Sequence, residues 1–466
     1  MRTGHRHRSW RSFTAIPALL LTLALLLSAC SISLGTVTTG TPIPPDAAAT
    51  SSAGATPGGQ GNCLPQTKHD DGSSDDQGTY LSPKQLWTLY GVEPLLRQCY
   101  TGKGQTVVVI DSFGSPTLQE DIDQFSDYYG LPRVKLQILA PLGTKPFDPT
   151  DNEMVGWAFE TTEDVQIIHA VAPEANIVVL TSPVDETEGV AGLPEFRQLE
   201  QYAIDHHLGS IVSQSWAASE VSLADSAGQA EVAKFDAFYH TATTTQGMTF
   251  FASSGDNGAT DCVRINPPLQ CVPSPTATTG FPNSDPWVTA VGGTTIKESG
   301  AQLSEVGWTG SGGGFSRFYA TPSYQQGLAA SVVQQLNHRR GVPDVASSAD
   351  GSIGLGCIFS LQPGLFAAGG TSAGSPLWAG LVAIANQMAG HSLGFLNPAL
   401  YKVALSANYG RDFHDITQGN NSYNDSGVNV PGYDAVPGWD PITGLGTPNA
   451  QYLLPDLIAA AGAGAS

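Results

Sequence analysis

The sequence predicts an α/β fold in which helices cover both faces of a mostly parallel β-sheet. Four apolar runs each end in a small polar or acidic residue, namely 105–111, 176–181, 210–215 and 248–253. Uninterrupted β-branched runs of this kind are typical of strands buried on both faces. Helical patterns lie between the runs, for example at 118–129, 157–170 and 193–207. This alternation predicts a single large domain around one sheet.

Three polar residues stand at or just after the ends of these runs, namely Asp111, Ser215 and Asp256. Parallel strands bring their carboxyl ends to the same edge of a sheet, and the active residues of such folds gather there. We therefore expect the functional site at this edge.

The first residues have the features of an export signal. Arginines precede an apolar stretch at 15–27, which is short for a membrane span. The stretch closes with Leu27-Ser28-Ala29-Cys30, which resembles the lipobox of bacterial lipoproteins. The resemblance implies a signal peptide over 1–29, lipid on Cys30, and a location on the outer face of the cell membrane or, after release, outside the cell. Residues 30–62 are rich in Ser, Thr, Gly and Pro, which predicts a disordered linker before a folded domain at 63–466 with a core at about 80–457.

The charge of the chain excludes one class of partner. The formal net charge is −21, and loss of four signal-peptide arginines takes it to about −25 (−21 − 4). Nucleic acid is therefore not an expected partner. Only 13% of the residues are charged, so the acidity also reflects scarce lysine and arginine, which suits a protein that works in acid. We expect a monomer, because no oligomerisation signal is visible.

The cysteines predict disulfides in an exported protein. With the lipidated cysteine set aside, five remain. Cys262 and Cys271 bracket a short proline-rich loop and are the first candidates for a bridge, while Cys63 and Cys99 could join the start of the domain. Cys357 is then unpaired, and we expect it to be buried.

The run 369–379 contains the best candidate for a nucleophile. Gly369 and Gly370 allow a tight turn, and Ser372 follows at the entry to an apolar helix. The free N–H groups and the dipole of a helix N-terminus favour a developing negative charge there. The alternative is that Ser372 only caps the helix.

A serine nucleophile needs a base, which is most often histidine. His169 lies in a stretch where a packed or exposed histidine is the better interpretation. Glu160 and Asp164 offer another route, because their i, i+4 spacing puts them on one face of a helix. Two acids so close can share a proton, since one pKa rises. The alternative is a solvated acidic helix end.

Asp256 is a further unusual acid, in the segment 251–258. An ionised aspartate only accepts hydrogen bonds, but a protonated one can donate to an oxyanion. Such a site would work only in acid. The alternative is an ordinary turn, which the local sequence also fits.

Together these residues resemble the sedolisin family, the serine-carboxyl peptidases, which have a subtilisin-like fold and a Ser-Glu-Asp set. The resemblance covers roughly 80–457, with the motifs in the family's order. Glu160 and Asp164 match the paired acids, Asp256 matches the oxyanion aspartate, and Ser372 matches the nucleophile. Three supporting runs also match, namely 281–294, 311–316 and 341–345.

The resemblance implies a serine-type endopeptidase that hydrolyses peptide bonds of proteins or peptides in acid. Glu160 would take the proton of Ser372 and later give it to the leaving amine, and Asp164 would orient Glu160. Asp256 and the N–H of Ser372 would stabilise the tetrahedral oxyanion. Two further residues match positions that extend the acid network in some relatives, namely Asp111 and Trp216.

The family pattern also implies one structural calcium ion near the C-terminus. Carboxylates and backbone carbonyls suit Ca²⁺, which takes many oxygen ligands. The ligands carried over are the side chains of Asp415 and Asp440 and the carbonyls of Ile416, Val436 and Gly438. Val436 stands where many relatives have glycine, which matters little to a carbonyl ligand. The alternative is a loop tied by Asx turns.

Two competing functions stay open. A conventional subtilisin-like peptidase would use Asp111, His169 and Ser372, but it leaves Asp256 unexplained. A non-catalytic or trans-activated surface lipoprotein would bind peptides in the same cleft. Most relatives carry a long N-terminal prodomain, and we expect only a linker in its place here, which makes the activation of the enzyme uncertain.

Overall fold

The computed structural model describes residues 63–75, 78–185, 189–266, 270–299, 302–425 and 427–462. The α-helices are α1 (Pro83–Leu89), α2 (Glu93–Arg97), α3 (Leu118–Tyr129), α4 (Asn152–Val171), α5 (Leu193–Asp205), α6 (Ser226–Thr245), α7 (Ala330–Leu336), α8 (Gly374–Ala389), α9 (Asn397–Ala404), α10 (Tyr409–Asp412) and α11 (Ala450–Gly462). Short 3₁₀ turns are η1 (Ser323–Gln325) and η2 (Thr371–Ala373).

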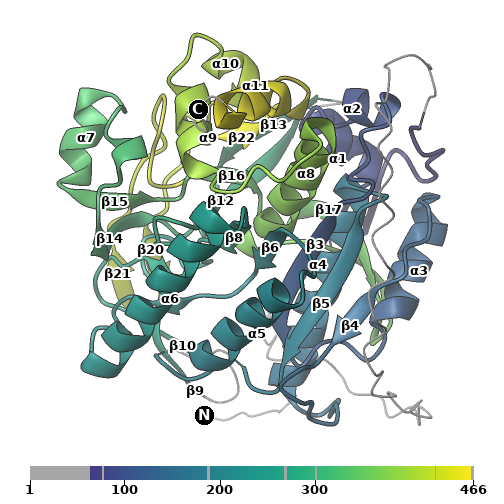
Figure 1. Ribbon diagram of the computed structural model, residues 1–466, viewed down its shortest axis with the longest axis horizontal. Coiled ribbons are helices and arrows are strands. Elements are labelled where there is room, and N and C mark those ends of the chain that lie inside the picture. Colours follow the sequence, from purple (N-terminus) through teal and green to yellow (C-terminus); the bar gives the residue numbers. More distant parts are fainter. Residues whose placement is uncertain are drawn as a thin grey trace, which may run out of the picture. The chain divides into compact units, whose positions relative to one another are not determined.

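The strands fall into one large sheet and several small ones (Figure 1). Those of the large sheet are β3 (Thr106–Ser112), β4 (Gln137–Leu139), β5 (Asn176–Ser182), β6 (Ile211–Gln214), β8 (Thr249–Ser253), β12 (Thr289–Ser299), β13 (Gln302–Gly307) and β16 (Val345–Ser348). The other strands are β1 (Ser73–Asp75), β2 (Gly78–Leu81), β7 (Ala218–Ser219), β9 (Cys262–Asn266), β10 (Gln270–Pro273), β11 (Gly280–Phe281), β14 (Gly314–Ala320), β15 (Arg339–Val342), β17 (Ile353–Phe359), β18 (Gln362–Ala367), β19 (Phe413–His414), β20 (Tyr423–Asp425), β21 (Val428–Val430) and β22 (Thr447–Pro448).

The large sheet has the order β13-β12-β8-β6-β3-β5-β4, with β16 also paired to β12. Every pairing in it is parallel except that of β13 with β12. This confirms the predicted α/β class with a mostly parallel sheet. The parallel strands all point the same way, so the ends of β3, β6 and β8 meet at one edge of the sheet.

Two hydrophobic cores lie on the two faces of this sheet, and β3 contributes to both. Val107 and Val109 pack into the core formed with α3, α4, α8 and α11. Val108 and Ile110 pack into the core formed with α5 and α6 (Figure 1). Alternate residues of one strand thus face opposite layers, which is why the run reads as continuously apolar in the sequence.

The predicted helices and strands agree with the observed ones to within a few residues, except at the start of α4. We expected this helix to begin at 157, but it begins at Asn152. The side chain of Asp151 accepts hydrogen bonds from the N–H groups of Glu153 and Met154, which supplies an N-cap upstream of the apolar pattern. Glu160 and Asp164 are therefore in the middle of a long helix.

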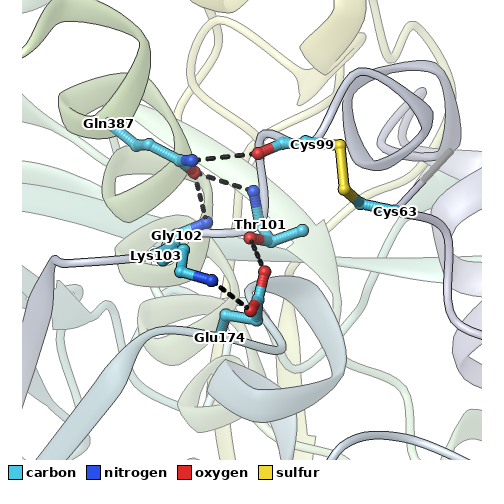
Figure 2. Close-up of a disulfide and its surroundings, with 7 residues drawn as sticks. All are labelled: Cys63, Cys99, Thr101, Gly102, Lys103, Glu174 and Gln387. Carbon is cyan, nitrogen blue, oxygen red and sulfur yellow. Dashed lines mark hydrogen bonds and ion pairs between the residues drawn. A yellow bond between two sulfur atoms is a disulfide. The ribbon is translucent and has the colours of Figure 1, made fainter. Parts of the chain in front are cut away.

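Both predicted disulfides are present, Cys63–Cys99 and Cys262–Cys271, and Cys357 is free and buried. Figure 2 shows how the segment after Cys99 is fastened to α8. The Gln387 side chain accepts from the N–H groups of Thr101 and Gly102, both at 2.8 Å, and donates to the Cys99 carbonyl at 2.9 Å. The start of the domain is thus joined to the helix that follows Ser372.

The described elements belong to one compact unit, Gly59–Ser466. Within the described ranges, no helix is both long and apolar enough to span a membrane. The predicted signal peptide, Cys30 and the linker at 30–62 lie outside the described residues, so these stay predictions.

Candidate active site

The turn before α8 presents Ser372. Gly370 has a φ of +70°, and a Cβ atom there would lie 2.6 Å from Oδ2 of Asp256, so only glycine fits. Ser372 lies in the 3₁₀ turn η2, and the N-cap position of α8 is Ala373, which makes no side-chain capping bond. The alternative that Ser372 caps this helix is therefore wrong. The side chain of Ser372 is half-buried, so it keeps some contact with solvent.

The structure brings Ser372 together with the acids of α4. Burial raises the pKa of Glu160 to about 8 and the nearby Asp111 adds to the rise, while the adjacent side chain of Ser372 lowers it. Glu160 itself is half-buried, with Oε1 inaccessible to solvent. Asp164 lies one helical turn further along α4 and is fully buried. The alternative of a solvated acidic helix end is therefore wrong.

Ser215 connects the deeper acid to the nucleophile turn. Its hydroxyl lies 2.9 and 3.0 Å from the two carboxylate oxygens of Asp164 and 3.3 Å from the carbonyl of Ser372. Ser215 follows β6, so its position depends on the sheet. The sequence pointed to Ser215 as a polar residue at a strand end, but it did not show this contact.

Asp256 holds the other side of the same turn. Its Oδ1 accepts from the N–H of Thr371 at 2.7 Å and from the Thr371 hydroxyl at 2.9 Å. Thr371 also accepts from the N–H of Gly255. Because Oδ1 takes both donors, Oδ2 is the oxygen that is left to carry a proton. Asp256 faces solvent, unlike the acids of α4, and the alternative of an ordinary turn does not explain these bonds.

Buried acids lie behind Glu160 without a basic partner. In the described part of the chain, no salt bridge involves Asp111, Glu160, Glu163 or Asp164. Burial raises the pKa of Asp111 to about 7, and it also raises the pKa of Asp164 well above its usual value. Neighbouring carboxyls add to the shift of Asp164. Such a group holds protons well above the pH at which exposed acids lose them.

Comparison with known proteins agrees with this geometry. Kumamolisin of Bacillus sp. (strain MN-32) is 36% identical over 313 residues, which are 65% of this chain and 51% of that protein. Tripeptidyl-peptidase 1 of Homo sapiens is 35% identical over 228 residues, which are 46% of this chain and 38% of that protein. A solved structure of Pseudomonas sedolisin, a serine-carboxyl proteinase, is similar with a TM-score of 0.63 at 27% identity and covers 77% of this chain and 94% of that one.

The chain is thus similar to members of the sedolisin family. The matched region spans 51% of the length of kumamolisin and 38% of the length of tripeptidyl-peptidase 1. No family model matches the chain. The likeness to Pseudomonas sedolisin also agrees with the predicted subtilisin-like fold, because it extends over nearly all of that structure.

The position of His169 agrees with the likeness to sedolisins and not with the subtilisin alternative. This residue is fully buried in α4, and its Nε2 lies 3.1 Å from the hydroxyl of Ser126 in α3. Burial lowers the pKa of His169 to about 4. Its hydrogen bond is to α3 and not to Ser372, so we discard the triad of Asp111, His169 and Ser372.

The two residues expected to extend the acid network differ. Asp111 lies beside Glu160 and Asp164 and raises the pKa of both. Neither oxygen of Asp111 has a hydrogen-bond partner among the described residues, since the adjacent Thr161 hydroxyl donates to the Trp157 carbonyl. Trp216 packs against Phe196, and its Nε1 likewise has no partner in the described ranges, so a hydrogen bond from Trp216 to the acids is absent.

The expected calcium ligands lie in one loop region near the end of the described chain. Asp415 accepts from the N–H of Gly438, and the fully buried Asp440 accepts from those of Ile442 and Thr443. Burial raises the pKa of Tyr409, and the nearby Asp415 and Asp440 raise it further. Within the described ranges, no group of three or more Asp, Glu, His or Cys side chains is placed to hold a metal.

Sequence reasoning missed two contributors to the site. Thr371 fixes Asp256 through two hydrogen bonds, one donated by its N–H and one by its hydroxyl. Its position next to the matched Ser372 is the feature of the sequence that could have identified it. Glu163 lies between Glu160 and Asp164 in sequence, and we did not expect it to face the nucleophile turn. Its Oε1 accepts from the N–H of Gly369 at 3.0 Å.

Proposed function

We propose that this chain is a serine-carboxyl endopeptidase that hydrolyses peptide bonds of proteins at acidic pH. The observation that carries the proposal is the position of Ser372 on a turn that Ser215 links to Asp164 of α4 and that Asp256 fixes on its other side. The likeness to sedolisin-family proteins and the peptidase names of these relatives support it. The substrates would be proteins or peptides.

The proposed chemistry starts at the hydroxyl of Ser372. Its oxygen attacks the peptide carbonyl carbon while Glu160 takes the proton, which gives a tetrahedral intermediate with a negative oxygen. Glu160 then gives the proton to the leaving amine, and water repeats the sequence on the acyl-enzyme. Asp164, one turn along α4, shares the site's proton with Glu160.

Asp256 would set the upper pH limit. With Oδ1 occupied by Thr371, a proton on Oδ2 can be donated to the oxyanion, alongside the N–H of Ser372. Loss of that proton turns Asp256 into an acceptor and removes the donor. Desolvation by the surrounding protein raises the pKa of Asp256, so the protonated donor form persists to higher pH than in an isolated aspartate.

The test is cleavage of a denatured protein by the purified chain from acid to neutral pH. Ser372→Ala should lower kcat by about 10⁶-fold, as for other serine nucleophiles. Glu160→Gln should lower it by about 10²–10⁴-fold, because the amide cannot take a proton. Asp256→Asn should keep activity at neutral pH, where the wild type loses it, because the amide donates at every pH.

Two results would contradict the proposal. Activity that peaks near neutral pH and survives Glu160→Gln would point to another base. A folded chain that is silent at every pH would favour the alternative, a surface lipoprotein that binds peptides in the same cleft or needs an activator.

We also propose that the chain binds one structural calcium ion through Asp415, Asp440 and the carbonyls of Ile416, Val436 and Gly438. Two features of the donor set support the fit. The three carbonyls accept no hydrogen bond from the described residues, and Asp440 is buried with no basic side chain in salt-bridge range within the same ranges. A bound calcium ion would neutralise the two carboxylates and tie the loop together.

We further propose that the chain is exported and anchored by lipid on Cys30, and that it works as a monomer. The Leu27–Cys30 motif after an apolar stretch supports the anchor. A linker at 30–62 would let the peptidase domain reach substrates away from the membrane surface.

A further inference from the structure

Glu163 is a buried acid that the proposed chemistry does not use. Its side chain is 2% exposed, and it lies on α4 between the two acids of the Ser-Glu-Asp set. Oε1 accepts the N–H of Gly369 at 3.0 Å. The bond joins residues that are 206 positions apart, so it fastens the catalytic helix to the turn that carries the nucleophile.

The turn is held from both sides of Gly370. Glu163 takes the N–H of Gly369 on one side, and Asp256 takes the N–H of Thr371 on the other. Gly369 has no room for a side chain, because a Cβ atom there would lie 2.9 Å from the Cα of Gly351. The two hydrogen bonds therefore fix the backbone path of the residues that immediately precede Ser372.

The surroundings of Glu163 favour a neutral carboxyl. Burial raises its pKa well above the usual value, and the nearby Glu160 and Asp256 raise it further. The thiol of Cys357 is also buried beside it. A neutral carboxyl can still accept the Gly369 N–H through its carbonyl oxygen.

We propose that Glu163 is a positioning residue, which holds the turn before Ser372 through the N–H of Gly369 so that the hydroxyl meets Glu160. The inference rests on the proposed peptidase function. Displacement of a reacting group by about 1 Å can cost roughly 100-fold in rate, so one hydrogen bond at this turn is enough to matter.

The test compares Glu163→Gln with Glu163→Leu in the full chain. The amide carbonyl of glutamine can accept the same N–H, so Glu163→Gln should keep kcat near the wild-type value. Leucine cannot accept, so Glu163→Leu should lower kcat by about 10- to 100-fold with KM nearly unchanged. If the leucine variant does not fold, Glu163→Met replaces it, because methionine adapts to irregular space.

Glu200 supplies a matched control. It is also a fully buried glutamate that accepts one hydrogen bond, from the hydroxyl of Tyr239 at 2.7 Å, but it lies on α5. Glu200→Leu should lower thermal stability without lowering kcat of the folded enzyme. An equal loss of kcat in Glu200→Leu and Glu163→Leu would mean that any buried defect has this effect, and it would overturn the inference.

A second measurement does not depend on activity. Amide hydrogen exchange of the segment 368–373 is followed in a Ser372→Ala background, with and without Glu163→Leu or Glu163→Gln. Faster exchange at Gly369 in the leucine variant alone would support the bond. Unchanged exchange in the leucine variant, or a loss of kcat in Glu163→Gln as large as in Glu163→Leu, would overturn it. A wild type without peptidase activity would sink the proposed function, while the exchange result would still decide the role of Glu163.

Discussion

Two regions of this molecule bury carboxylates in opposite ways. Asp344 pairs with Arg340 in a bidentate contact, with Nη1 to Oδ1 at 2.8 Å and Nη2 to Oδ2 at 2.6 Å, and both side chains are 0% exposed. Asp344 also accepts from the N–H of Ala290 and the hydroxyl of Tyr401. The acids behind Ser372 are equally buried, but no salt bridge reaches them in the described ranges.

The difference separates a structural use of charge from a chemical one. In the first region the carboxylate and the guanidinium balance each other's charge, and removal of either one would leave a buried charge unpaired. Carboxyls without such a partner keep their protons and can exchange them with a nearby hydroxyl. The candidate active site therefore depends on having, among the described residues, no basic partner of the kind that stabilises Asp344.

The largest expected effect on stability comes from breaking the buried ion pair between Arg340 and Asp344. Asp344→Asn should lower the free energy of unfolding by about 3–5 kcal/mol, since it leaves a buried guanidinium without its charge partner. Asp164→Asn should cost only about 1 kcal/mol, because Ser215 can still donate to the amide oxygen. Chemical unfolding of both variants in one buffer checks this.

A double variant, Arg340→Met with Asp344→Leu, serves as the control. It removes both charges, so it should be less damaging than Asp344→Asn alone. If Asp344→Asn and Asp164→Asn destabilise the protein equally, the two regions do not differ in the way described.

The next effect concerns the pH dependence of stability. The pKa of Asp111 is raised from 3.8 to about 7, so between these values the folded state binds more protons than the unfolded state. Stability that is fully present below the unfolded pKa is then lost as the pH rises toward the folded pKa. We expect Tm to fall by about 5 °C across this window.

Asp111→Asn tests the origin of that slope. The variant removes one of the titrating groups, so its Tm should change less between the same two pH values. A calorimetric scan series gives the answer, and a wild-type Tm that rises steadily through the window would contradict the assigned direction.

The smallest effect should come from the calcium loop, where a cation would take the place that Arg340 has opposite Asp344. Removal of calcium with a chelator should lower Tm by about 3 °C, the equivalent of 1–2 kcal/mol. Asp415→Asn should abolish the response without changing the Tm of the chelated protein much. Identical Tm values with and without calcium in the wild type would rule out the proposed ion.

The sequence alone predicted most of the scaffold. Runs such as 105–111 appear as strands because burial on both faces requires continuous apolar residues, and the pairing of Cys262 with Cys271 follows from their closeness in the chain. The start of α4 was missed by five residues, since Asp151 caps the helix before its apolar pattern begins. Helix ends depend on single hydrogen bonds, which the period of a pattern does not record.

The sequence by itself also placed Glu160, Asp164, Asp256 and Ser372 in the order of a known family, and it determined the spacing that puts the first two on one helical face. Only the tertiary structure decided that Ser215 contacts Asp164, that Trp216 makes no hydrogen bond to the acids in the described ranges, and that Glu163 faces Gly369. The physical reason is distance along the chain. Local spacing fixes the faces of one helix, whereas contacts between segments up to 206 residues apart depend on how α4, β6 and the turn before α8 pack together.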